Sequence, residues 1–352
     1  MKLALVHDWL ISLGGAERVL IELHRIFPSA PIYTLLADPA FLKHYLPGAV
    51  VVTSALNRFP FARSFRRTLA LAMPMAVESF DLSEYDAVLS SSVFFAKGLI
   101  LKPRTKHVCY CYSPTRQLWD RTHQSAPGFI GTAVKQVLRI WDRQAAERVD
   151  RFIAISAHVQ ERIRRYYGRQ ADVVYPPLML EDANPEQTSD KGYFLIVSRL
   201  FPHKNIEVAV DAFNKLGSRL VIAGNGPLRE KLERGARRNI TFVGSQSDDE
   251  LLEWYRHARA LIMPQEEDFG LTPLEIMQFG KPVLALRRGG ALETVQEGIS
   301  GEFFDDPIPE ALADGVKRLN EKLSSYDPEA IKASVRRFSR DDFERHIKQL
   351  VS

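Results

Sequence analysis

Short apolar runs recur along the chain, each followed by a turn rich in glycine or polar residues and then by residues with helical spacing. Continuous apolar runs of this kind are typical of parallel strands that helices cover on both faces. Strands are predicted over residues 2–7, 86–90, 107–112, 152–156, 193–197, 219–223, 240–243, 260–263 and 282–286. Helices are predicted from the glycine turn at 13–17 to 26, over 60–72, 131–149, 206–216, 248–257 and 271–279, and from 309 onward. The pattern predicts an α/β protein built from strand–turn–helix units.

A change in composition divides the chain. Residues 181–191 are polar, include Pro185 and show no periodicity, so they are predicted to form a linker. The strand-first pattern begins again at 193. A chain of 352 residues is also long for a single hydrophobic core. Two domains are therefore expected, over residues 1–178 and 190–335.

The most informative loop joins the strand at 260–263 to the helix at 271–279, and it brings Glu267 before that helix and Glu275 into its first turn. Free amides at a helix start attract anions, and Gly270 lets a phosphate approach the backbone closely. Carboxylates at such a place would repel a phosphate unless they bind hydroxyls or face a developing cation. Sugars supply both, so the loop favours a nucleotide-sugar over a bare nucleotide.

A structural interpretation of Glu275 stays open. Thr272 as cap, Pro273 at the first helical position and Glu275 reaching back would form a capping box. Glu267 has no comparable structural explanation.

Two cations flank another strand-to-helix loop. Arg199 follows the strand at 193–197 and Lys204 precedes the helix at 206–216, so both could converge on one anion. A solvated surface pair is the alternative. Near the start of the chain, Gly15 lies between a strand end and a helix start, where open α/β sheets bind ligands, although a tight turn also requires glycine.

Two further segments allow both a structural and a functional interpretation. Residues 113–120 form an aromatic and basic loop that suits sugar stacking and phosphate contacts, although Trp119 could equally pack on the domain. In the helix predicted over 60–72, phenylalanine and arginine side chains occupy opposite faces. The basic surface of 58–72 is either a solvated face or a contact with anionic lipid headgroups.

Composition bears on other classes. The net charge of +4 is mild and spread along the chain, so nucleic acid is not indicated as a partner. No apolar run approaches the roughly 20 residues that span a bilayer, and His7 and Asp8 interrupt the signal-like start at 1–6, so a cytoplasmic protein is expected. Cys109 and Cys111 have no metal-ligand companions, and two buried free thiols are expected.

Glu267 and Glu275 are spaced as Glu-x7-Glu and precede a Gly-Lys-Pro-Val run at 280–283 and a Gly-Gly-x-x-Glu turn at 289–293. The whole run resembles the donor-site signature of glycosyltransferase family 4. The resemblance implies an α/β fold of the GT-B type, with two Rossmann-like domains facing each other across a cleft. It also implies a retaining reaction, and a final helix at about 339–352 that packs back on the first domain.

The resemblance also implies the roles of individual residues. Arg199 and Lys204 would stabilise the leaving diphosphate, and Glu267 would orient the donor sugar and stabilise its cationic centre. Glu275 would hold the ribose hydroxyls. Two cations would substitute for a metal ion, so neither a metal nor another cofactor is expected. The other donor-binding residues are expected to be Gly15, Gly244, Phe269, Gly270, Leu271 and Thr272.

The strand at 6–10 and the run from Tyr110 to Asp120 resemble a subgroup that contains mannosyltransferases of bacterial surface polysaccharides. That subgroup has a histidine near the donor sugar where this chain has Tyr112, and a tyrosine where this chain has Gln117. The departure at Tyr112 therefore bears on which sugar is transferred. The residues expected on the acceptor or sugar side are Asp8, Tyr112, Arg116 and Trp119.

The implied function is transfer of a hexosyl unit, with mannosyl favoured, from a nucleotide-sugar to a glycan or lipid-linked acceptor in polysaccharide biosynthesis, including that of lipopolysaccharide. GDP-mannose is the favoured donor, and UDP- and dTDP-sugars that would supply glucosyl or rhamnosyl units stay open. The alternatives are an epimerase or phosphorylase of the same fold and a catalytically silent nucleotide-sugar-binding subunit. Contact through residues 58–72 would place the protein at the inner face of the membrane as a peripheral protein.

Overall fold

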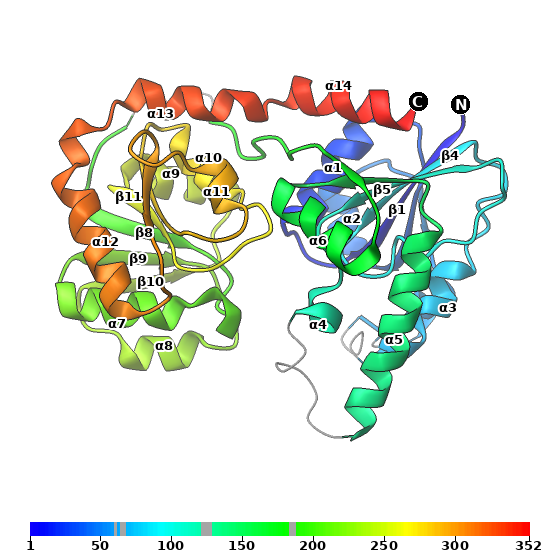
Figure 1. Cartoon of the computed structure of the whole chain (residues 1–352), viewed down its shortest axis with the longest axis horizontal. Helices are drawn as coiled ribbons and strands as arrows, with labels where there is room; N and C mark the ends of the chain where they lie inside the picture. The colour runs from blue at the N-terminus through cyan, green and yellow to red at the C-terminus, as the bar shows by residue number, and fades with distance from the viewer. Residues whose placement is uncertain (60–61, 64–67, 121–128, 183–187) are drawn as a thin grey trace. The chain divides into compact units, whose positions relative to one another are not determined.

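The structure is a computed structural model that describes residues 1–59, 62–63, 68–120, 129–182 and 188–352. These residues form two compact units: unit 1 comprises Met1–Pro176 with Asp341–Ser352, and unit 2 comprises Pro177–Arg340. Each unit has its own parallel sheet with helices packed against it (Figure 1). Both units are therefore Rossmann-like α/β layers.

Within the described residues, unit 1 contains a seven-stranded sheet in the order β3-β2-β1-β4-β5-β6-β7, and its ladders are parallel. The strands are β1 (Leu3–Leu10), β2 (Ile32–Ala37), β3 (Val51–Thr53), β4 (Ala87–Ser92), β5 (Lys106–Cys111), β6 (Arg151–Ala154) and β7 (Ala171–Val173). β1 extends beyond its predicted end at residue 7 because its last two residues pair with Leu36 and Ala37 of β2. The central strands are buried along nearly their whole length, as covered parallel strands require.

Helices of unit 1 follow the strands. They are α1 (Gly15–Ile26), α2 (Pro39–Tyr45), α3 (Met73–Glu78), α4 (Arg116–Trp119), α5 (Phe129–Glu147), α6 (Ala157–Tyr167) and α14 (Arg340–Val351), with short 3-10 helices at Ala55–Arg58 and Thr68–Leu71. α6 starts after Ser156, whose hydroxyl caps the helix by accepting a bond from the Val159 N–H at 3.0 Å. α6 ends at Gly168, whose φ of 64° is the left-handed stop that favours glycine.

α14 belongs to unit 1 from Asp341 onward and packs against the strands at the beginning of the chain. The Phe343 ring meets the Tyr110 ring edge-on, with 5.8 Å between the centroids. The Glu344 carboxylate pairs with the Arg25 guanidinium of α1 at 2.9 Å. Burial of apolar side chains on one stripe of an amphipathic helix is the main force that holds α14 there.

The helices and strands predicted for unit 1 were incomplete. The helix predicted over 60–72 lies partly outside the described residues, which omit 60–61 and 64–67. In the part that is described, the chain forms the 3-10 helix Thr68–Leu71 and then α3. The sequence analysis also missed β2, β3 and α2, which lie between α1 and that segment.

Unit 2, over its described residues, contains a six-stranded parallel sheet in the order β10-β9-β8-β11-β12-β13. The strands are β8 (Tyr193–Val197), β9 (Arg219–Ala223), β10 (Ile240–Gly244), β11 (Ala260–Met263), β12 (Val283–Leu286) and β13 (Gly301–Phe304). The helices are α7 (Ile206–Leu216), α8 (Arg229–Gly235), α9 (Asp248–His257), α10 (Thr272–Met277), α11 (Ala291–Thr294), α12 (Pro309–Glu321) and α13 (Pro328–Val335). α7 packs beside α12, and α10 contacts α9, α11 and α13 (Figure 1). The strands predicted at 193–197, 219–223 and 260–263 are confirmed.

α10 differs from its prediction in two ways. It is shorter than the predicted 271–279. Its N-cap is Leu271, and no side chain caps it, so the capping box predicted for Thr272 and Glu275 is wrong. After α10 the chain turns at Gly280, whose φ of 67° is the left-handed conformation that favours glycine.

Candidate active site

The strand order of unit 2 places a topological switch between β8 and β11. These strands pair through Phe194 with Ala260 and through Leu195 with Leu261. From β8 the chain continues to β9 on one side, whereas from β11 it continues to β12 on the other. The loops that leave the carboxyl ends of β8 and β11 therefore lie next to each other, at the place where open α/β sheets bind ligands.

Lys204 and Glu267 come from these two loops and form an ion pair between Nζ and Oε1. Lys204 ends a short 3-10 helix, Pro202–Lys204, and its side chain is 9% exposed, whereas that of Glu267 is 26% exposed. The Gln265 side-chain amide donates to the same Oε1 at 3.1 Å. An accessible carboxylate is thus held beside a buried ammonium group.

Asn205 links the same two loops. Its Nδ2 donates to the Pro264 carbonyl at 3.1 Å. Its φ is 53°, and within the described part of the chain it is the one residue other than glycine with a positive φ. Asparagine tolerates this left-handed conformation better than most residues, and strained backbone often marks a functional site. The bend at Asn205 directs the chain from Lys204 into α7.

Gly289 and Gly290 support the Glu267 loop from the end of β12. Gly289 forms a parallel bridge with Glu267, and the Gly290 N–H donates to the Glu267 carbonyl at 2.9 Å. A Cβ added to Gly289 would lie 2.3 Å from that carbonyl oxygen, and one added to Gly290 would lie 2.3 Å from the Cα of Phe269. The sequence analysis identified a glycine turn here. The structure shows that close backbone contact also requires glycine at both positions.

Arg199 and Phe269 occupy different environments in the same region. Arg199 is exposed in the loop after β8, and its guanidinium carbon lies 5.8 Å from the centroid of the Phe201 ring. Phe269 is buried, and its ring contacts Phe338 at a centroid distance of 5.6 Å. Arg199 therefore lies on the Lys204 loop, whereas Phe269 anchors the Glu267 loop in the core.

Apart from Gly15, which opens α1 in unit 1, the remaining residues expected to bind the donor lie at the end of β10 or in the loop and helix that follow β11. Gly270 has a φ of 91°, and it precedes the half-buried Leu271 and Thr272 at the start of α10. Gly244 ends β10, so β9 and β8 separate it from β11. Glu275 is buried in α10, and its Oε2 accepts a bond from the Tyr255 hydroxyl at 2.6 Å. Of these residues, Gly270, Leu271 and Thr272 are the nearest in sequence to Glu267.

Asp8 lies at the corresponding switch in unit 1, between β1 and β4. Its Oδ2 accepts bonds from the backbone N–H groups of Val93 at 2.7 Å and Phe94 at 3.0 Å. Its Oδ1 accepts from Phe95 at 2.5 Å and Ala96 at 2.9 Å. Asp8 is 1% exposed, so its carboxylate fixes the loop after β4.

Tyr112, which stands where the resembling subgroup has histidine, is bonded within unit 1. Its hydroxyl donates to the Ala16 carbonyl at 3.0 Å and lies 2.9 Å from the Ser91 hydroxyl. Burial raises the pKa of Tyr112 well above its usual value, so the hydroxyl remains protonated. His7 Nδ1 lies 2.9 Å from the Ser91 carbonyl, to which it can only donate. The bond from Tyr112 to Ala16 holds the first turn of α1, which Gly15 opens.

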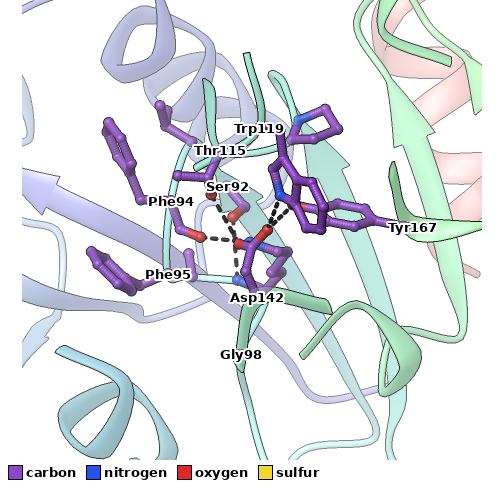
Figure 2. A network of polar contacts seen from close by, with 12 residues as sticks. Ser92, Phe94, Phe95, Gly98, Thr115, Trp119, Asp142 and Tyr167 are labelled. Carbon is purple, nitrogen blue, oxygen red and sulfur yellow. Dashed lines mark hydrogen bonds and ion pairs between the residues drawn. The ribbon is translucent and has the colours of Figure 1, made fainter. Parts of the chain in front are cut away.

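The two other residues expected on the sugar side belong to α4. Arg116 is half-buried at its start. The Trp119 ring stacks on Tyr166 with 5.3 Å between centroids, and its indole N–H donates to Asp142 at 2.7 Å (Figure 2). These contacts fit the interpretation in which Trp119 packs on its own domain.

The chain matches two known protein families. Residues 13–181 match the family described as Glycosyltransferase Family 4, and residues 180–346 match Glycosyl transferases group 1. The chain belongs to glycosyltransferase family 4. Its activity is therefore glycosyl transfer.

Several relatives and solved structures resemble this glycosyltransferase. The alpha-1,3/1,6-mannosyltransferase ALG2 of Dictyostelium discoideum is 22% identical over 395 residues, which cover 92% of this chain and 91% of the relative. A GDP-mannose-dependent mannosyltransferase of Mycobacterium tuberculosis, which acts on phosphatidylinositol monomannoside, is 27% identical over 54% of this chain and 57% of its own length. HepE of Anabaena in complex with UDP superposes with a TM-score of 0.72 at 20% identity over 99% of both chains. Sucrose-phosphate synthase from Thermosynechococcus elongatus gives 0.76 at 17% identity, over 99% of this chain and 98% of the other. This likeness shows that the fold is GT-B.

The described part of the glycosyltransferase also bears on metal binding, membrane insertion and the state of its thiols. There, no group of three or more His, Cys, Asp and Glu side chains is placed to hold a metal ion. Over the same residues, no helix has the length and apolar character needed to cross a membrane. Cys109 and Cys111 are free and buried, as predicted.

Sequence reasoning missed several residues that build the two regions. Asn205 and Gln265 lie close in sequence to predicted site residues. The partner of Asn205 comes from another loop, and the bond of Gln265 depends on a side-chain direction that sequence spacing does not give. Asp142 was missed although its position carried a signal: it falls on the buried stripe of α5, between Leu138 and Ala145. A charged residue on such a stripe is rarely buried without partners.

Proposed function

We propose that this glycosyltransferase moves a hexosyl unit, with mannosyl favoured, from a nucleotide-sugar to a hydroxyl of a glycan or lipid-linked acceptor, with retained configuration and without a metal ion. Unit 2 would hold the donor and unit 1 the acceptor. Mannosyltransferases among the relatives support GDP-mannose as the donor. A fold neighbour solved with UDP-glucose makes that sugar nucleotide the competing donor.

The observation that carries the proposal is the Lys204–Glu267 pair at the switch between β8 and β11. Departure of a nucleoside diphosphate leaves negative charge on phosphate and an oxocarbenium-like sugar. A cation and an accessible carboxylate held together would stabilise both charges. Each preorganised group of this kind typically contributes roughly 3 kcal/mol to the transition state.

Arg199 extends the same site because it lies exposed on the loop that ends in Lys204. Two cations on one loop would take the place of a divalent ion against a diphosphate. Lys204 and Glu267 balance each other's charge in this pair. A bound diphosphate would compete for the ammonium group and leave Glu267 to the sugar.

We also infer a role in polysaccharide biosynthesis at the inner face of the membrane, with the basic segment 58–72 as the contact. In its described part this segment carries Arg58 beside Phe59, whose side chain is 62% exposed. An apolar side chain next to arginine suits a surface of anionic headgroups.

The deciding experiment is transfer from GDP-mannose, UDP-glucose and dTDP-rhamnose to a mixed glycan acceptor, with the new glycosidic bond detected by mass spectrometry and its configuration by NMR. We expect Glu267→Gln and Lys204→Met to lower kcat by about 10²- to 10³-fold. Only Lys204→Met should also weaken binding of the nucleoside diphosphate. The matched control is Glu310→Gln, which removes an exposed pair with Lys215 in unit 2 and should leave kcat unchanged.

Unchanged turnover in both site variants would refute the assignment. Donors can be ranked beforehand by thermal shift, because a ligand at about 100 times its dissociation constant stabilises by roughly 2.7 kcal/mol. A protein that binds a nucleotide-sugar but forms no bond to any acceptor would be the silent subunit instead.

A further inference from the structure

Asp142 of α5 accepts hydrogen bonds from four side chains in the interior of unit 1. Oδ1 accepts from Lys97 Nζ at 2.6 Å and from the Thr115 hydroxyl at 2.9 Å. Oδ2 accepts from the Trp119 indole N–H at 2.7 Å and from the Tyr167 hydroxyl at 2.9 Å. Figure 2 shows Thr115, Trp119 and Tyr167 converging on Asp142. We call these five residues the Asp142 cluster.

The cluster contains a buried charge pair. The side chains of Lys97 and Asp142 are 2% and 1% exposed. Burial by itself would lower the pKa of Lys97, but the neighbouring Asp142 carboxylate acts in the opposite direction and the pKa is raised, so Lys97 keeps its proton. The Phe94 carbonyl accepts a second bond from Lys97 Nζ at 2.6 Å. Apolar replacements of such pairs are often as stable, so a fold has no general need for one.

What the pair does follows from where its partners lie. Thr115 is the N-cap of α4 and Trp119 is its last residue, so one carboxylate holds both ends of a single helical turn. Lys97 comes from the loop after β4, whereas α4 follows β5. Asp142 therefore ties together two loops at the carboxyl edge of the sheet, where α/β units bind ligands.

Other contacts hold α4 in place and cover the Trp119 ring. Arg139 of α5 donates to the Leu118 carbonyl through Nε at 3.0 Å and Nη2 at 2.8 Å. Arg139 also lies over the Trp119 ring, at 5.7 Å from its centroid, and Tyr166 stacks on that ring. The residue of α4 that carries a charge is Arg116, half-buried beside the exposed Gln117.

We propose that Asp142 is a positioning residue, which holds α4 so that Arg116 meets phosphate oxygens of a substrate. The inference rests on the proposed function, in which both the donor diphosphate and a lipid-linked acceptor carry phosphate. A guanidinium binds phosphate through two parallel bonds, and this needs a fixed direction as well as a charge. A single helical turn has too few internal bonds to supply that direction.

The test measures binding rather than turnover, so that it stands even if no transfer is found. Calorimetry with GDP, UDP and farnesyl phosphate separates the donor from the acceptor as the source of phosphate. Thr115→Val keeps the side-chain shape but removes one bond to Asp142. We expect it to weaken one of these three probes about tenfold, as loss of a bond to a charged group does. Arg116→Ala should weaken the same probe.

The double variant Thr115→Val/Arg116→Ala decides the mechanism. If Asp142 acts through Arg116, the double variant binds as Arg116→Ala does. Multiplied losses, or unchanged binding of all three probes by Thr115→Val, would overturn the proposal. A failure to detect any new glycosidic bond would count against the proposed function alone.

Two variants without the buried charge pair separate positioning from stability. Lys97→Met/Asp142→Asn keeps an amide oxygen to accept from α4, and it should bind within about twofold of the wild type. Lys97→Met/Asp142→Leu removes the acceptor and should bind the probe as weakly as Thr115→Val does. Equal affinity of the Asp142→Asn and Asp142→Leu double variants would contradict the proposal. The control is Glu302→Gln of unit 2, a carboxylate that is 2% exposed and accepts from Lys322 at 2.9 Å. It should lower the melting temperature without changing binding.

Discussion

At the scale of single residues, Asn205 joins backbone geometry to the proposed chemistry. It has the left-handed conformation that the turn after Lys204 requires, and its side chain reaches the Pro264 carbonyl on the neighbouring loop. The conformation and the bond can be separated by substitution, because glycine provides the first without the second.

We predict that Asn205→Gly loses about 1 kcal/mol of unfolding free energy, the usual contribution of one hydrogen bond. Asn205→Ala should lose a further 1–2 kcal/mol or so, because alanine pays for a positive φ. Both variants should lower kcat, since each frees the loop that carries Lys204. Denaturant unfolding and steady-state kinetics measure these effects. Equal stability of the two variants would mean that the conformation at Asn205 imposes no cost.

At the scale of elements, the two acidic residues of the Glu-x7-Glu motif have unequal surroundings. Glu267 lies in a loop that Gly289 and Gly290 support by close backbone contact, and its side chain stays accessible. Glu275 lies inside α10 and bonds to Tyr255 of α9. Glu267, in the loop, is therefore placed to meet a sugar, whereas Glu275, within the helix, also serves packing.

The exposed apolar side chains around the basic segment 58–72 support a prediction for that element. Phe59 and Met75 are 62% and 69% exposed. We expect wild-type protein to sediment with phosphatidylglycerol vesicles at low salt, and less so as ionic strength rises. Phe59→Ser/Met75→Ser should reduce sedimentation at least several-fold, because two apolar contacts with the acyl boundary are lost.

A matched control is available in unit 2. Ile308 is 48% exposed and apolar, so Ile308→Ser makes a comparable change away from the basic segment. That variant should sediment like the wild type. If wild-type protein stays in the supernatant with anionic vesicles, the membrane contact has to be abandoned.

At the scale of the whole molecule, His107 on β5 makes stability depend on pH. It is buried, and burial lowers its pKa from 6.5 to about 4, although Asp150 acts in the opposite direction. The unfolded chain therefore takes up the proton first as the pH falls. The contribution of neutral His107 to the free energy of unfolding is fully present above about pH 6.5 and is lost progressively as the pH falls to about 4.

We predict that this loss amounts to about 3 kcal/mol, at 1.36 kcal/mol per pKa unit. Unfolding free energies of wild type and His107→Gln, measured between pH 4 and 7, isolate it from the carboxylates that titrate in the same range. Glutamine can still bond to the Ser90 hydroxyl, which lies 2.9 Å from His107 Nε2. The variant should lose less stability on acidification, and parallel curves would show that His107 does not cause the dependence.

The order of strands is the property of the whole molecule on which the candidate site depends. Apolar runs and glycine turns predicted most strands and placed Lys204 and Glu267 after two of them. They did not predict that β8 and β11 would be neighbours, because pairing depends on which strands the connecting helices bring together. β3 and α2 were missed because their short segments have weak local periodicity. β2 is an apolar run that is buried throughout, so its pattern was sufficient to predict it.

Two identical spacings show where local information ends. Ser247 and Glu250 form a capping box at the start of α9, with both reciprocal bonds present. Thr272 and Glu275 have the same spacing at α10 and do not form one. The Glu275 carboxylate is bonded instead to Tyr255, which is brought near by the packing of α9 on α10. A buried tyrosine within reach thus becomes the partner of the Glu275 carboxylate, and the local sequence pattern does not predict this bond.

By itself, the sequence determined the α/β class, the turns that need glycine and the residue types that follow each strand, because these depend on neighbours along the chain. Tertiary structure decided which side chains meet: Lys204 with Glu267, Asp8 with the amides of Val93–Ala96, and Lys97 with Asp142. Each of these contacts joins segments far apart in sequence. Their energies depend on the burial and direction that only the packed sheet provides.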